Sequence, residues 1–71
     1  MPVITVPEDL VRTEVSLVGE DGNAWAIMGR VAAALDSAGN SKEVVESYRE
    51  QAMSGDYNHL LAVTLQFVDA M

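Results

Sequence analysis

The sequence predicts an α+β fold in which a short N-terminal strand or hairpin is followed by three packed helices, in the order ββααα. Residues 11–18 alternate between apolar and polar side chains, which is typical of a half-buried strand. Three later stretches repeat apolar residues at helical spacing, and each follows a residue that caps helices well. With 71 residues and no cysteine, the chain is expected to form one small acidic domain, residues 1–71, without disulfides.

Two apolar runs form the predicted strand region. Residues 3–6 are rich in β-branched side chains, and a turn at residues 7–10 would let them pair with residues 11–18 as a hairpin. We expect one face of the second run to be buried, and this face consists of Val11, Thr13, Val15 and Leu17.

The first helix is expected to begin after Asn23, whose side chain can accept a hydrogen bond from an unpaired backbone amide, although Asp21 could serve instead. It ends at Gly39, a residue suited to the left-handed conformation. Gly29 lies inside it at a cost of about 1 kcal/mol relative to alanine, which predicts the close approach of another element. The apolar stripe contains Ala24, Ile27, Met28, Val31, Ala34 and Leu35.

Ser41 and Asp56 are the expected caps of the second and third helices, and Gly55 separates the two helices. The inward face of the second helix is predicted to be Val44, Val45, Tyr48 and Ala52. The apolar face of the third is predicted to be Tyr57, Leu60, Leu61, Thr64, Leu65 and Val68, extended by Phe67.

The net charge of −7, from eleven acidic and four basic residues, opposes direct binding to nucleic acid or to an anionic membrane. The same charge suits a protein partner with a basic surface. No apolar run approaches the ~20 residues of a membrane span, and the N-terminus lacks the features of a secretory signal. We therefore expect a cytoplasmic protein without a membrane partner.

The turn Gly19–Gly22 has the spacing of a phosphate-binding loop, but Glu20 and Asp21 would repel a phosphate. It also lacks the later glutamate of a calcium loop, so we interpret it as a helix start. His59 is the single histidine, and Asp56, three residues earlier, could form a dyad with it or simply cap the helix. Ser54 is near His59 in sequence only. We expect no catalytic site, no metal and no cofactor, and hence no enzyme.

Glu43, Glu46 and Glu50 follow one another at helical spacing, so they share one face of the second helix. Such a row is either a solvated face or an imitation of a phosphate backbone, which Glu20 and Asp21 could extend. Trp25 lies off the centre of the first apolar stripe, where it is either part of the core or an exposed anchor for a partner. These six residues are the expected partner-binding set.

The segments GEDGNAWAIMGRVAAAL and SGDYNHLLAVTLQFVD resemble a family of small bacterial and prophage proteins of unassigned function. The resemblance covers about residues 14–69, and the first dozen residues differ from the family. It implies a phage or mobile-element context and transfers no catalytic residues.

The expected function is that of a non-enzymatic inhibitor of a nucleic-acid-handling host complex, similar in size and charge to some anti-CRISPR proteins. An acidic surface would compete with DNA or RNA for the arginine and lysine side chains of a basic groove. The alternative is a structural or accessory protein that self-associates through an apolar helix face, so the chain is expected to be a monomer or a homodimer. The salt dependence of binding distinguishes the two functions, because higher ionic strength weakens a charge-driven complex but hardly affects an apolar one.

Overall fold

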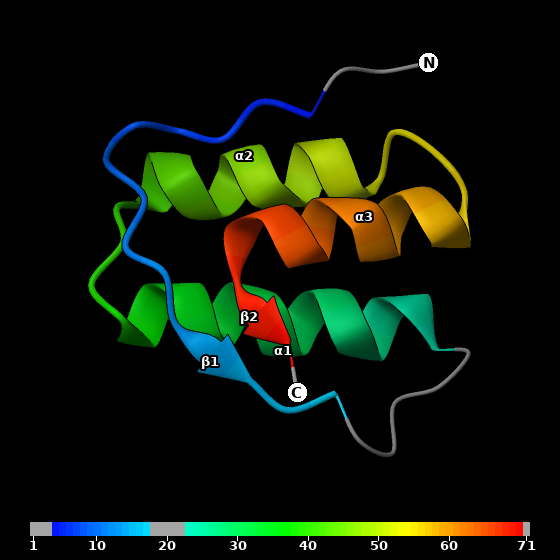
Figure 1. Cartoon of the computed structure of the whole chain (residues 1–71), viewed down its shortest axis with the longest axis horizontal. Helices are drawn as coiled ribbons and strands as arrows, with labels where there is room; N and C mark the ends of the chain where they lie inside the picture. Colours follow the sequence, from blue (N-terminus) through cyan, green and yellow to red (C-terminus); the bar gives the residue numbers. More distant parts are fainter. Residues whose placement is uncertain (1–3, 18–22, 71) are drawn as a thin grey trace.

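The computed structural model describes residues 4–17 and 23–70. Within these residues the elements follow in the order β1 (Glu14–Val15), α1 (Ala24–Ser37), α2 (Lys42–Ala52), α3 (Tyr57–Phe67) and β2 (Asp69–Ala70). The helices lie side by side and alternate in direction, with α2 running opposite to α1 and α3 (Figure 1). All three contact one another, and β1 packs on α1, so the fold is α+β as expected.

The two strands come from opposite ends of the described chain. β1 pairs with β2 in parallel, with Glu14 opposite Asp69 and Val15 opposite Ala70. The predicted hairpin is therefore wrong, since residues 4–6 form no strand in the described part of the chain. Val11 is 47% exposed, contrary to expectation, because the alternating run pairs as a strand only at Glu14 and Val15.

Side-chain amides hold the N-terminal segment, residues 4–12, where a hairpin was expected. The amide of Gln51 accepts a hydrogen bond from the backbone N–H of Thr5 and donates one to its carbonyl, both at 2.7 Å. Asn40, in the loop between α1 and α2, does the same for Val11. Each side-chain amide has one donor and one acceptor for the backbone, as a neighbouring strand would have. The segment is therefore held against the helices without pairing as a strand.

The predicted helix caps are confirmed. Asn23 accepts from the backbone amide of Ala26 at 3.0 Å, and Ser41 and Asp56 cap the other two helices in the same way. Gly39 has a φ of 95°, the left-handed conformation expected after α1. None of the described helices combines the length and apolarity that a membrane crossing requires.

The core lies between the three helices and the small sheet. Tyr48 is at its centre: its hydroxyl is 2.8 Å from the Thr64 hydroxyl, and its ring meets Phe67 edge-on with centroids 5.4 Å apart. Burial raises the pKa of the Tyr48 hydroxyl above its ordinary value of 10.0, and the hydrogen bond with Thr64 offsets part of the rise.

The buried face of α3 differs by one position from the expected face. Leu65 is 56% exposed, and Val63 is buried in its place. The buried residues of α3 are Leu60, Val63, Thr64 and Phe67, which have the spacing of one helical face. Leu65 comes five residues after Leu60, about 140° around the helix from it, so it faces away from the buried side of α3. The chain then leaves the helix, and the buried Val68 leads into β2.

Candidate binding surfaces

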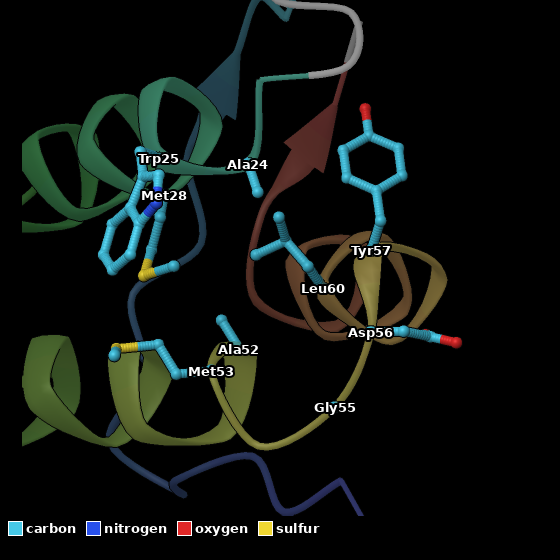
Figure 2. Close-up of a pocket in the computed structure, with 9 residues that line it drawn as sticks. All are labelled: Ala24, Trp25, Met28, Ala52, Met53, Gly55, Asp56, Tyr57 and Leu60. Atoms are coloured by element: carbon cyan, nitrogen blue, oxygen red, sulfur yellow. The ribbon is translucent and has the colours of Figure 1, made fainter.

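An apolar pocket of about 250 Å³ lies where the start of α1, the end of α2 and the start of α3 come together (Figure 2). We call it the helix-end pocket. Met28 and Met53 point into the space between α1 and α2, whereas the carboxylate of Asp56 points away. Its lining residues are Ala24, Trp25, Met28, Ala52, Met53, Gly55, Asp56, Tyr57 and Leu60.

Trp25 borders this pocket with 73% of its surface exposed, and Met53 across from it is 57% exposed. The interpretation of Trp25 as a core residue is therefore wrong, and its side chain has the exposure that an anchor for a partner needs. Two large apolar side chains at one pocket form a surface that water solvates poorly. The sequence did not predict that Met53 lies exposed beside this pocket, because Met53 follows the last residue of α2, Ala52, and so lies outside the helical pattern.

The three glutamates of the predicted row, Glu43, Glu46 and Glu50, are all exposed on the outer face of α2. Lys42 approaches Glu46 at 3.9 Å, an ion pair one helical turn apart and open to water, so it neutralises the row weakly. None of the three glutamates lines the helix-end pocket with Trp25. Glu20 and Asp21 lie outside the described residues.

A second hollow, of about 380 Å³, lies between the middle of α1 and the start of α2, and we call it the α1–α2 groove. Its lining residues are Gly29, Ala32, Ala33, Asp36, Lys42, Val45 and Arg49. The predicted close approach at Gly29 is wrong within the described structure, since a β-carbon added there would meet nothing within 4 Å. Small and charged residues therefore both line the groove.

His59 and Asp56 do not form a dyad. The Asp56 carboxylate accepts from the backbone amide of His59 at 2.9 Å, which is the expected cap. The imidazole instead contacts Ser54, whose Oγ is 3.0 Å from Nε2, so the two are neighbours in space as well as in sequence.

The backbone carbonyl of Gln51 indicates which nitrogen of the His59 imidazole carries a proton. It lies 2.9 Å from His59 Nε2 and 2.7 Å from Ser54 Oγ, and a carbonyl can only accept. The Ser54 hydroxyl and the His59 Nε2–H therefore both donate to this carbonyl. Because Nε2 carries the proton, it cannot accept the proton of Ser54 as a base would. Ser54 and His59 therefore supply hydrogen-bond donors to a carbonyl in the last turn of α2.

Among the described residues, no three histidine, aspartate or glutamate side chains lie close enough together to hold a metal ion. The described surface presents an apolar pocket with an exposed tryptophan, a groove lined by small and charged residues, and an acidic helix face. The described residues thus form a small α+β fold with these three surface features. No family model, curated protein or solved structure matches the chain.

Proposed function

We propose that this chain is a non-enzymatic binding protein that presents the acidic outer face of α2 to a basic surface of another protein. The observation that carries the proposal is the exposure of Glu43, Glu46 and Glu50 along one side of a single helix. The net charge of −7 supports it, because a strongly acidic chain attracts cationic surfaces over a longer range than one contact would.

The spacing of the glutamates suits a surface that normally binds phosphates. Residues three and four apart in a helix rise by about 4.5 and 6 Å along its axis, between one and two times the ~3.4 Å rise per phosphate along one DNA strand, so the row is a repeated line of negative charge at a somewhat wider spacing. Lysine and arginine side chains that hold a nucleic acid backbone could pair with these carboxylates instead. The partner class is therefore a nucleic-acid-handling complex with a basic groove.

Occupation of such a groove would inhibit the complex, since the chain and the nucleic acid would compete for the same cations. Inhibitors of the anti-CRISPR type, encoded by phages or other mobile elements, are the specific form that we propose. The support is the small size and acidity of the chain, together with the exposed row on α2. The helix-end pocket is a separate surface with a different composition.

Affinity capture tests the proposal. The tagged chain is incubated with bacterial lysate at low salt and eluted with a salt step, and bound proteins are identified by mass spectrometry. The test variant carries Glu43→Gln, Glu46→Gln and Glu50→Gln. The control variant carries Glu8→Gln, Asp9→Asn and Glu14→Gln, which removes the same amount of charge from three other exposed residues.

We expect capture of a nucleic-acid-binding complex that is lost with the α2 variant, kept with the control and displaced by added DNA or RNA. Equal loss with both variants would show that only total charge matters and would refute a defined acidic face. Recovery of the chain alone, or of a partner that survives high salt and the α2 substitutions, would also refute the proposal.

A further inference from the structure

The N-terminal segment follows α2 without pairing as a strand, and we call its residues 4–10 the strap. The strap runs along α2 in the opposite direction, from Gln51 near the end of the helix to Asn40 just before its start (Figure 1). None of its residues is buried. Its contact with the core comes from Ile4 and Leu10, which are half-buried.

The outer end of the strap is held by exposed hydrogen bonds. The Gln51 amide binds both backbone groups of Thr5 at 2.7 Å, and water has access to both contacts. The Ser47 hydroxyl accepts a further hydrogen bond from Nε2 of Gln51 at 3.1 Å, which orients the amide toward the strap. Because water can replace exposed hydrogen bonds, these contacts contribute little to the free energy that holds the strap closed.

The inner end of the strap adjoins residues that are held much more firmly. Val11 is paired with Asn40, which is only 7% exposed. Arg12 binds three carbonyls at the end of α3 as well as Asp69, and the Thr13 carbonyl accepts from the Asp69 amide at 2.9 Å. From Val11 onward the chain is thus fixed to two parts of the fold, and the attachment weakens toward the outer end of the strap.

We propose that the strap opens from α2 and closes again as one unit while the three helices stay folded. Gln51 is its latch, and the pair of Val11 and Asn40 is its hinge. Within the strap, the Leu10 amide donates to the Pro7 carbonyl at 3.2 Å, and this turn keeps the inner half compact when the latch releases. Opening uncovers the part of the core on which the half-buried side chains of the strap lie.

Charge favours the open strap at low ionic strength. The strap carries the exposed acids Glu8 and Asp9 on a chain whose net charge is −7. At roughly 0.01 M salt the Debye length is about 30 Å, whereas the structure extends 29 Å along its longest axis, so the rest of the chain repels these two acids. At roughly 1 M salt the Debye length is about 3 Å, and the repulsion is screened. Higher ionic strength should therefore close the strap.

Cysteine labelling of the full chain tests the strap, because the chain has no cysteine of its own. Ile4→Cys and Leu10→Cys report on the two ends of the strap, and Val63→Cys, at a fully buried position of α3, reports on opening of the helices. Each is labelled with the neutral reagent iodoacetamide, and its rate is divided by the rate for the same chain unfolded in urea at the same salt concentration. The three variants are compared with and without Gln51→Ala. Gln66→Ala, which removes an exposed glutamine side chain from α3, is the matched control.

We expect Gln51→Ala to speed the labelling at both strap positions by the same factor, about two- to fivefold, because removal of the latch raises the population of open straps. A rise in salt from roughly 0.01 to 1 M should slow the labelling at both positions by about twofold or more. Val63→Cys should stay protected under all these conditions, and Gln66→Ala should leave every rate unchanged.

Faster labelling at Ile4→Cys alone would overturn the proposal, because it would mean that only the end of the segment frays. An equal acceleration at Val63→Cys would mean that the whole fold opens. Strap positions that label as fast as the unfolded chain, or that do not respond to Gln51→Ala, would mean that Gln51 holds no closed strap. A rise in rate with salt would refute the role assigned to charge. No variant alters the α2 glutamates, so this test is independent of the proposed function.

Discussion

The side chain of Asn40 pairs with the backbone of Val11 as a neighbouring strand would. Its Oδ1 accepts from the Val11 amide at 2.7 Å, and its Nδ2 donates to the Val11 carbonyl at 2.9 Å and to the Leu35 carbonyl at the same distance. Asn40 is almost fully buried, and both polar atoms of its side chain have partners. It thereby joins the N-terminal segment to the end of α1.

We expect Asn40→Ala to lower the free energy of unfolding by about 2–3 kcal/mol, because the substitution removes one buried and two partly buried hydrogen bonds. Gln51→Ala is the control: it removes a similar pair of hydrogen bonds to Thr5, but these are exposed and water can replace them. It should cost about 0.5–1 kcal/mol. Urea unfolding measures both values, and equal losses would contradict the importance of burial at Asn40.

Arg12 should stabilise the C-terminal end of α3. Its guanidinium donates to the carbonyls of Leu65, Gln66 and Val68 and pairs with Asp69 at 2.8 Å. We expect Arg12→Ala to cost about 1–2 kcal/mol in urea unfolding, because the last carbonyls of α3 lose a charged donor.

Asp69→Asn provides the comparison for Arg12. It should cost less than about 0.5 kcal/mol, since an ion pair this exposed contributes little. A loss with Asp69→Asn as large as that with Arg12→Ala would show that the ion pair, and not the contacts with the carbonyls, stabilises this end.

Tyr48 should make the protein sensitive to alkaline pH. Because burial raises its pKa in the folded state, the unfolded chain releases this proton first, at about pH 10. The stabilisation is complete below that pH and is lost as the pH rises through the higher folded pKa. Unfolding measured at several values above pH 10 should show a shallower decline for Tyr48→Phe than for the wild type. An equal decline in the two proteins would contradict the buried Tyr48 hydroxyl as the source of the alkaline sensitivity.

Two glycines should respond oppositely to alanine. Gly55→Ala would place a β-carbon 2.7 Å from Cγ of His59, so the His59 side chain or the backbone must shift, and we expect a loss of about 1–3 kcal/mol. Gly29→Ala adds its methyl to open space and should gain about 0.5–1 kcal/mol through helix propensity. Thermal unfolding compares them, and destabilisation by Gly29→Ala would mean that the fold needs a glycine at this position.

The local features of the chain were predictable from neighbouring residues. The caps at Asn23, Ser41 and Asp56 and the left-handed Gly39 all depend on interactions within one helical turn. The exposed row of α2 was predictable for the same reason, since helical spacing alone brings Glu43, Glu46 and Glu50 to one side. The sequence by itself therefore determined three helices, their boundaries within a few residues, and the acidic character of the surface.

Only the tertiary structure decided which distant segments meet. β1 pairs with a strand more than fifty residues later in the chain, and the side-chain amide of Asn40 hydrogen-bonds to the backbone of Val11. The expected hairpin therefore does not form. The exposure of Trp25 and the open space at Gly29 likewise depend on where α2 and α3 pack against α1. The physical reason is that a local pattern states which groups need burial or a partner, whereas long-range packing selects which of them receive it.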